Sequence, residues 1–458
     1  MSPPFRYEGY HLDPGRGLLT CRYSLGRWEF AEKVSFDPAG RWDSPPVAQA
    51  ARLIFLLAGV SYYKTAAPDI IDLGETPVSE PEREFLRGFY LDGLGEFGYR
   101  NGLDLSGLKI VGGASPAPAA AGPGEPPAPT QTEPPVLRLA DGVPGDGKPR
   151  VLIPFGGGID SIVTVEMMRP LSDPALFVLS RPGHRFAAIE GAAAVTGMPI
   201  IRAGREIDPQ LFRSAELGFR NGHVPVTGIL SAIAVMAAVL DGRDTVVMSN
   251  EWSASVATLE VGGRAINHQY SKSAEFEAGF RAALDGALGG QMTYFSALRP
   301  FTELWVAQKF AALTQYHDTF RSCNRAFNID PAKRLDHWCG RCDKCCFIDL
   351  ILAPFLPADD LKRIFGGAEP LADPSLADRF RALLGTSADS KPFECVGEVG
   401  ECRAAAVLAA GRPDRAETPL LHALTAELPA EPPALADLLR PVGEHSIPDA
   451  YATDDLLV

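Results

Sequence analysis

A glycine-rich stretch at residues 150–166 constrains the fold of this chain more than any other. It reads RVLIPFGGGIDSIVTVE, a short apolar run followed by three glycines and then by a helical pattern. An apolar run of this length is typical of a buried parallel strand. A strand, a glycine turn and a helix start form an anion site, because the backbone can approach closely and free N–H groups point at the anion. The stretch therefore predicts a phosphate site beside a parallel sheet.

The residues of the turn narrow the kind of phosphate site. No Gly-Lys-Ser/Thr follows the glycines, and the dinucleotide pattern Gly-x-Gly-x-x-Gly is absent from the stretch. Residues 156–161 instead resemble the PP-loop, Ser-Gly-Gly-x-Asp-Ser, of the ATP pyrophosphatase superfamily, with Gly156 in place of the first serine. That resemblance implies cleavage of ATP to AMP and diphosphate. The alternative is a glycine turn without a ligand. The predicted nucleotide contacts in this stretch are Phe155, Gly156, Gly157, Gly158, Asp160 and Ser161.

Four segments with different patterns divide the chain. Residues 1–113 begin with three strand-length runs, which predict an antiparallel meander, and continue as helices, one of which is expected to start at a capping box of Ser79 and Glu82. This pattern predicts a small N-terminal α+β domain. Residues 114–148 are rich in Pro and Ala and are expected to form an extended linker. Residues 149–346 alternate strands and helices, and residues 347–458 are mainly helical. The predicted fold class is α/β: a doubly wound parallel-sheet domain, PP-loop and HUP-like, between the α+β domain and a helical C-terminal region.

Three loops of the α/β segment are expected to form one ligand crevice. They follow predicted strands and cover residues 156–161, 180–184 and 249–255. Ligands on parallel sheets bind at the carboxyl ends of the strands, where these loops lie. The resemblance to the PP-loop superfamily implies that Ser180 lies near the adenosine, and Asn250 is the further predicted nucleotide contact.

A polar stretch after the fourth predicted strand supplies candidate substrate-binding side chains. Cationic residues there could bind carboxylate or phosphate oxygens. His268 is a candidate for proton transfer, because histidine side chains ordinarily titrate near neutral pH. A surface histidine is the alternative. The predicted substrate-binding residues are Arg264, Tyr270, Lys272, Lys309, Lys64 and Arg100.

A cluster of cysteines predicts a metal centre. Cys323, Cys339, Cys342 and Cys345 include two Cys-x-x-Cys steps and can supply four thiolates to a tetrahedral ion, with Cys346 as the spare. We therefore expect a structural Zn²⁺. Reduced, buried thiols without a metal are the alternative, and disulfides are less expected in a cytoplasmic chain.

Charge and hydropathy exclude some classes of function. The net charge of −14 argues against a nucleic-acid partner but permits a small anionic substrate in a locally basic pocket. The longest apolar stretches, near residues 53–60 and 229–240, are too short to span a bilayer. The N-terminus leads into a strand pattern without a signal peptide. We expect a soluble, cytoplasmic protein.

Five segments together resemble one family over nearly the whole chain, the Pro/Ala linker excepted. They read FRYEGYHLDPGRGLLTCRYSL, LLAGVSYYK, GLGEFGYRNGL, FGGGIDS and WCGRCDKCCF. They are similar to the UDP-N-acetylmuramoyl-L-alanyl-L-glutamate epimerase (MurL) family. The resemblance implies ATP- and Mg²⁺-dependent inversion of the terminal L-glutamate of UDP-MurNAc-L-Ala-L-Glu, a precursor of peptidoglycan. AMP and diphosphate would be by-products, and an L-glutamate-adding ligase would act first.

The implied reaction agrees with the chemistry of the residues. The α-hydrogen of a carboxylate is too weakly acidic for a side-chain base, whereas that of an acyl adenylate is much more acidic. The glycine loop would hold the diphosphate leaving group, and Mg²⁺ would neutralise the phosphates. Inversion needs proton transfer on two faces of the α-carbon, or one mobile group. His268 and Glu251 are the candidates, and Asp160 completes the predicted catalytic set.

Two other functions agree with parts of the sequence. A PP-loop adenylating enzyme of the deazapurine type, forming an amide or nitrile, would share the adenylation step and a similar cysteine arrangement. The long N-terminal and C-terminal segments count against it. A non-catalytic nucleotide-binding sensor would explain Gly156 in place of serine.

Overall fold

The structure of the chain is a computed structural model that describes residues 3–113, 148–328, 330–387, 392–394, 396–429 and 435–452. The expected linker at 114–148 lies outside the described residues, apart from Lys148. Within the described residues, helices fall short of the length and apolar character that a membrane span requires.

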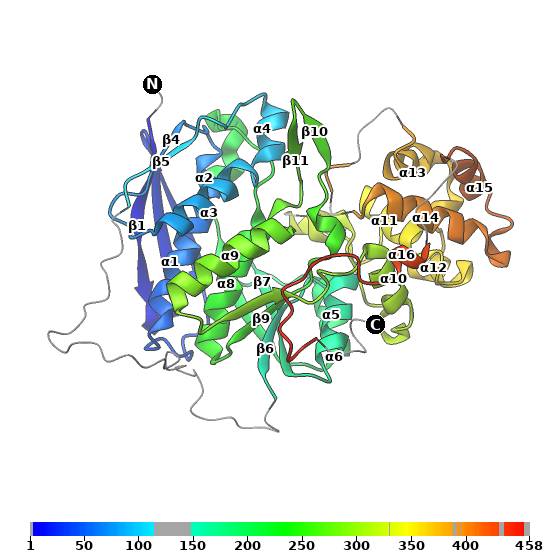
Figure 1. Ribbon diagram of the computed structural model, residues 1–458, viewed down its shortest axis with the longest axis horizontal. Coiled ribbons are helices and arrows are strands. Elements are labelled where there is room, and N and C mark those ends of the chain that lie inside the picture. Colours follow the sequence, from blue (N-terminus) through cyan, green and yellow to red (C-terminus); the bar gives the residue numbers. More distant parts are fainter. Residues whose placement is uncertain are drawn as a thin grey trace, which may run out of the picture.

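The described residues form a ten-stranded sheet (Figure 1), in which the order of neighbouring strands is β12-β9-β6-β7-β8-β3-β2-β1-β4-β5. A separate two-stranded sheet pairs β10 with β11. The strands are β1 Phe5–Asp13, β2 Leu18–Leu25, β3 Trp28–Ser35, β4 Ile70–Asp72, β5 Lys109–Val111, β6 Arg150–Pro154, β7 Asp173–Ser180, β8 Ile200–Glu206, β9 Thr245–Met248, β10 Leu259–Val261, β11 Arg264–Ile266 and β12 Thr293–Ser296.

The helices alternate with the strands and then dominate the C-terminal region. They are α1 Pro46–Ala58, α2 Val60–Tyr63, α3 Glu80–Leu91, α4 Gly95–Asn101, α5 Ile159–Met168, α6 Ala187–Thr196, α7 Ser214–Leu217, α8 Val226–Asp241, α9 Ala274–Leu288, α10 Glu303–Ala311, α11 Asp343–Leu352, α12 Ala358–Ile364, α13 Ala377–Leu384, α14 Val399–Ala410, α15 Pro419–Ala426 and α16 Leu435–Leu438. The predicted capping box is present, because Ser79 and Glu82 bond reciprocally at the start of α3.

The sheet has a parallel half and an antiparallel part. Strands β12, β9, β6, β7 and β8 pair in parallel, so the predicted parallel sheet with alternating helices is confirmed. Strands β1, β2 and β3 form the predicted antiparallel meander. The two parts join where β3 pairs with β8, antiparallel, with Ser35 opposite Gly204. The N-terminal segment and the α/β segment, which the sequence separates at residues 114–148, therefore share one sheet.

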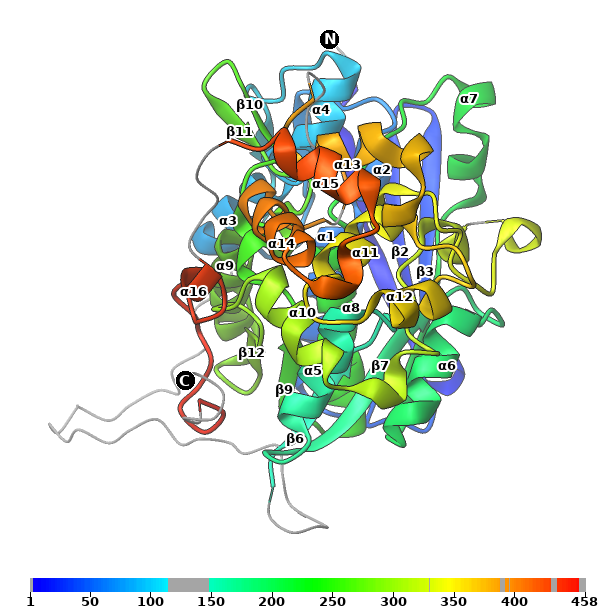
Figure 2. The ribbon, with the colours of Figure 1, turned by 90° about the vertical axis from the view of Figure 1, so that its right-hand side faces the viewer.

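Helices cover both faces of the parallel half. Neighbouring residues of a strand point to opposite faces, and Ile153 packs in a core with α5, α6 and α10, whereas Leu152 packs in a second core with α1, α8 and α9. The C-terminal helices join the first core: α11 is buried along most of its length and packs against α10, α13 and α14. Figure 2 shows these helices stacked over the side of the molecule that carries α5 and α10.

Candidate active site

A cavity of about 410 Å³ opens at the carboxyl ends of β6 and β9. The glycine loop, the loop after β9, the 3₁₀ turn Tyr270–Lys272 and the C-terminal region line it. Two of the three loops that we expected to converge, 156–161 and 249–255, therefore meet here. Helix α11 and the C-terminal region contribute lining residues too, among them Lys344 and Glu394.

The glycine loop presents the start of α5 to this cavity. Gly157 has a φ of +75°, and a Cβ atom there would lie 2.5 Å from the carbonyl oxygen of Ala188, so this position requires glycine. A Cβ atom at Gly156 would meet no neighbour within 4 Å, so packing does not explain the absence of serine there. The Ser161 hydroxyl donates to the carbonyl oxygen of Gly158, at 3.1 Å, and so holds the turn.

Three carboxylates from separate segments meet beside the loop. Oxygen atoms of Asp160, Glu251 and Glu303 lie within 4.8 Å of one another. Glu251 and Glu303 are 1% and 2% exposed. Each of the three residues has a buried carboxylate oxygen without a hydrogen-bond partner: Asp160 Oδ1, Glu251 Oε2 and Glu303 Oε2. We call these three residues the carboxylate cluster.

Burial places the carboxylate cluster under electrostatic strain. Desolvation, reinforced by the charge of Glu251, raises the pKa of Asp160 to about 6. Burial and the charge of Asp160 raise the pKa of Glu303 well above its usual range. Burial also raises the pKa of Glu401 on α14 to about 8, and Glu401 accepts a hydrogen bond from Leu304 N. Without a cation, the repulsion between these negative charges is relieved by binding protons. A bound cation would neutralise the same carboxylates instead.

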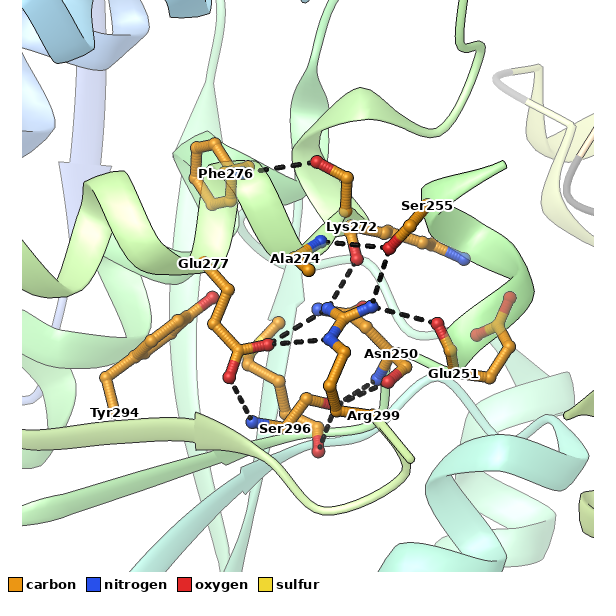
Figure 3. Close-up of polar contacts among 12 residues, drawn as sticks. Asn250, Glu251, Ser255, Lys272, Ala274, Phe276, Glu277, Tyr294, Ser296 and Arg299 are labelled. Atoms are coloured by element: carbon orange, nitrogen blue, oxygen red, sulfur yellow. Dashed lines mark hydrogen bonds and ion pairs between the residues drawn. The ribbon is translucent and has the colours of Figure 1, made fainter. Parts of the chain in front are cut away.

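Arg299 fixes the two segments that carry Glu251 and Lys272 (Figure 3). Its Nε donates to Glu277 Oε2 at 3.0 Å, Nη1 to Glu251 O at 2.9 Å and Nη2 to Lys272 O at 2.6 Å. Arg299 and Glu277 are 2% and 3% exposed. In Figure 3 the side chains of Glu251 and Lys272 extend away from the guanidinium toward the same side of the view. The buried ion pair therefore sets the backbone positions of both residues.

Replacing Arg299 by lysine should lower both stability and activity. A lysine keeps the charge opposite Glu277 but cannot reproduce the planar set of bonds to Glu251 O and Lys272 O. We expect a loss of about 2 kcal/mol in the free energy of unfolding and roughly a tenfold loss of catalysed turnover, because the loops would shift. Denaturant unfolding and initial rates measure the two effects, with the exposed Arg220→Lys as the matched control. Unchanged stability would contradict the role of Arg299.

His268 lies next to the cavity rather than on its wall. Its Nδ1 is 2.5 Å from Glu96 Oε2, and its side chain is 13% exposed. The His223 ring lies 4.2 Å from the His268 ring, centroid to centroid, and the Phe393 ring 6.4 Å. Burial, with the neighbouring His268 charge, lowers the pKa of His223 to about 4. A carboxylate that bonds Nδ1 fixes the orientation of an imidazole ring.

The other predicted substrate-binding residues occupy several places. Lys272 lines the cavity. Lys64 donates to Asn221 Oδ1 and to Gly222 O, and Arg100 pairs with Glu96 at 2.7 Å, so both lie around His223 and His268. Arg264 donates to Leu91 O and to Asp92, Tyr270 packs in the second core, and Lys309 is exposed with its Nζ 4.9 Å from the Trp305 ring. The structure thus places Arg264, Tyr270 and Lys309 away from the cavity wall, because each meets other partners.

Ser180 faces a different cavity from the one that we expected. Phe177 and Leu179 of β7 line the cavity beside the glycine loop, whereas Ser180 lines a second one, of about 870 Å³, formed by β8 and the loops after β3 and β7. Successive residues of a strand point to opposite faces, so a shift of one residue changes the cavity. Asn250 and Phe155 do line the cavity beside the glycine loop, as expected of nucleotide contacts.

The four predicted cysteines converge. The Sγ atoms of Cys323, Cys339, Cys342 and Cys345 lie within 4.8 Å of one another. Cys345 Sγ is 3.6 Å from Cys339 Sγ and 3.4 Å from Cys342 Sγ. Four sulfurs bound tetrahedrally at Zn–S bonds of about 2.3 Å would lie roughly 3.8 Å apart. The sulfur arrangement is therefore close to that of a closed zinc site, and zinc itself stays a prediction.

Sequence reasoning missed Glu303, Glu96 and His223 as site residues. Glu303 begins α10 directly after its N-cap Thr302, which makes it look like an ordinary helix-start acid. Its signal was an acid at the start of an otherwise apolar helix. Glu96 belongs to a polar stretch of the N-terminal segment, and His223 to a loop before α8. Glu96 and His223 are distant from His268 in the sequence, and only the folding of the chain brings them next to it.

Comparisons with known proteins cover almost the whole chain. A family model described as the MurL N-terminal domain matches residues 1–297, and one described as the MurL C-terminal domain matches residues 319–438. Curated proteins named UDP-N-acetyl-alpha-D-muramoyl-L-alanyl-L-glutamate epimerase are similar. The protein from Xanthomonas oryzae pv. oryzae is 37% identical over 97% of this chain and 95% of its own length. Those from a Micromonospora species and from Salinispora tropica are 37% and 38% identical, each over 98% of this chain and over 96% and 94% of their own lengths.

Proposed function

This chain belongs to the MurL family, and from that membership we propose that it inverts the terminal L-glutamate of UDP-MurNAc-L-Ala-L-Glu to D-glutamate. ATP and Mg²⁺ drive the reaction through an acyl adenylate, and AMP and diphosphate are released. An L-glutamate-adding muramyl ligase supplies the substrate. The partners are small molecules, without nucleic acid.

One observation carries the chemical part of the proposal. The glycine loop, Asp160 of the carboxylate cluster and two lysines, Lys272 and Lys344, line one cavity of about 410 Å³, and Glu251 and Glu303 lie beside Asp160. Backbone N–H groups and lysines bind phosphate and carboxylate oxygens, and buried carboxylates bind a divalent cation. Such a set is suited to joining a nucleotide triphosphate to a substrate carboxylate.

The residues present suit Mg²⁺. Asp160, Glu251 and Glu303 each have a buried carboxylate oxygen without a partner, and one oxygen of each lies within 4.8 Å of the others. Carboxylate oxygens are the ligands that Mg²⁺ prefers. When bound there, Mg²⁺ supplies charge neutralisation at the phosphates. Glu251, which we expected to transfer a proton, is instead assigned to this cluster because its carboxylate faces two other carboxylates.

The side chains of the cavity divide the reaction between them. The N–H groups at the start of α5 hold the diphosphate as it leaves, and Lys272 and Lys344 orient the substrate carboxylate beside the α-phosphate. Attack of that carboxylate forms the acyl adenylate, whose α-proton is then removed and restored on the opposite face. His268, held by Glu96, is one of the two proton-transfer groups. Hydrolysis of the adenylate releases AMP and the product.

Binding of Mg²⁺ should strengthen as the pH rises from 5 to 7. The pKa of Asp160 is raised to about 6, so at pH 5 roughly nine-tenths of this carboxyl is protonated and competes with the cation. Without metal the trend reverses: a folded pKa above the unfolded value of 3.8 makes this group's contribution to stability fall as the pH rises from about 4 to 6. Thermal unfolding at several pH values, with and without Mg²⁺, tests both trends. A Mg²⁺-induced increase in Tm that is as large at pH 5 as at pH 7 would contradict the assignment.

Two products of the proposed reaction test it: AMP, and a substrate whose terminal residue is D-glutamate. The native protein is incubated with ATP and Mg²⁺, with and without UDP-MurNAc-L-Ala-L-Glu. AMP and diphosphate are measured, and the chirality of the glutamate is determined after acid hydrolysis of the product. We expect AMP that depends on the substrate, together with D-glutamate. AMP without D-glutamate would favour an adenylating enzyme of the deazapurine type. D-glutamate without AMP would support the epimerase activity but exclude the acyl adenylate as an intermediate.

A further inference from the structure

A glutamate of the C-terminal region reaches into the cavity. Glu394 lines it together with Asn324 and Lys344. Asn324 Nδ2 donates to Glu394 Oε1 at 3.0 Å, so the carboxylate is held in place by a neighbour that also lines the cavity. Among the described lining residues, the carboxyl groups are those of Asp160 and Glu394, and Asp160 belongs to the carboxylate cluster. Of these two carboxyl groups, that of Glu394 is the one outside the proposed cation site.

The surroundings of Glu394 suit a group that gains and loses a proton. Burial raises its pKa, Asp343 adds to that rise, and the charges of His268 and Lys344 oppose it. A carboxyl group in this balance is a better proton carrier near neutral pH than an exposed one. Glu394 lines the cavity, and the ring of the preceding residue, Phe393, lies 6.4 Å from the His268 ring.

Neighbouring contacts fix the position of this segment. The Phe393 ring lies 4.9 Å from the Arg100 guanidinium, 6.0 Å from the Tyr99 ring and 6.4 Å from the His268 ring. These partners belong to α4 and to the loop after β11. Phe393 therefore anchors the segment 392–394 against the N-terminal part of the chain, and the next side chain, Glu394, faces the cavity.

We propose that Glu394 is a catalytic residue that carries the α-proton on one face of the glutamyl α-carbon. This inference rests on the proposed function. A Glu394 carboxylate oxygen takes the proton, the C–H bond breaks, and its electron pair passes into the enolate of the activated carboxyl group. The second proton-transfer group, which the proposed function assigns to His268, gives a proton to the opposite face and forms the new C–H bond. Proton return from Glu394 to His268, directly or through solvent, restores the starting state.

The test separates adenylation from proton transfer. Native protein and Glu394→Gln are incubated in D₂O with ATP and Mg²⁺ and with either the L- or the D-glutamyl substrate. AMP release, epimerised product and deuterium at the α-carbon are measured. For the variant we expect AMP release within about threefold of native, epimerised product lowered about 100-fold or more, and deuterium incorporation lost from one epimer only. A substrate-binding role would not produce that asymmetry between epimers.

The controls make each outcome decisive. Glu394→Asp should recover part of the epimerisation because it restores a carboxyl group, and the exposed Glu417→Gln should behave as native. Epimerisation by Glu394→Gln within tenfold of native would overturn the proposal, as would a parallel loss of AMP release in a folded variant. Lack of AMP from the native protein would instead overturn the proposed adenylation.

Discussion

Asp160→Asn should lower substrate-dependent AMP release by about 1,000-fold while leaving the fold intact. The Asp160 carboxylate lines the cavity, follows the glycine loop and lies within 4.8 Å of the Glu251 and Glu303 carboxylates. An amide has a similar shape but lacks the charge that holds a divalent cation beside the phosphates. Initial rates of AMP formation measure the loss.

The same variant should be more stable than the native protein when metal is absent. Asparagine removes one of several like charges from a buried cluster, where an uncompensated charge is costly. We therefore expect a higher Tm in EDTA together with a loss of the Mg²⁺-induced rise. Asp285→Asn, at an exposed position of α9, is the matched control and should change neither quantity. A variant that kept native AMP release would exclude Asp160 from the cation site.

Cys342→Ser should remove a bound zinc ion and unfold the C-terminal region. Cys342 is the N-cap of α11, and α11 is the helix against which α10, α13 and α14 pack. The free energy of a structural zinc site is folding free energy, about 10–16 kcal/mol in small zinc domains, so its loss exceeds the stability of most domains. Metal analysis of the purified protein should fall from one zinc per chain to nearly none, and helical content should fall with it.

Cys346 provides the control for this prediction. It follows Cys345 directly and is buried, but it lies outside the group of four converging sulfurs. Cys346→Ala should therefore keep one zinc per chain and lose only the packing of a small side chain. Equal metal contents in the two variants, or native protein without stoichiometric zinc when prepared without chelator, would show that the four cysteines are reduced thiols rather than a metal site.

The features that could be predicted from the sequence are those that short stretches of the chain determine. The glycine loop, the meander of β1 to β3, the capping box at Ser79 and the four cysteines all depend on short stretches whose chemistry can be recognised by spacing. Asn250 lines the cavity because it follows β9, and polar residues that follow parallel strands meet at one edge of the sheet. Nucleotide binding by Asn250 and substrate binding by Lys272 stay predictions.

Other parts of the site are formed by residues that are far apart in the sequence and meet only in the folded structure. Glu303 lies far along the chain from Asp160, and Glu96 reaches His268 from the N-terminal segment. No periodicity relates such residues, so the sequence alone could not pair them. Ser180 shows a second limit: the end of β7 was located correctly, but the face of the strand decides which cavity a side chain enters.

The joint between β3 and β8 affects how the chain can fold during synthesis. Helix α1 buries nearly all of its side chains, and it packs against α8, which follows roughly 170 residues later. At 5–20 residues per second, a ribosome needs roughly 10–30 s to produce that partner. During this interval the apolar side of α1 and the pairing edge of β3 are uncovered. The nascent N-terminal segment is therefore a natural client for a chaperone that acts at the ribosome, and slowing translation before residue 226 should increase aggregation of the newly made chain.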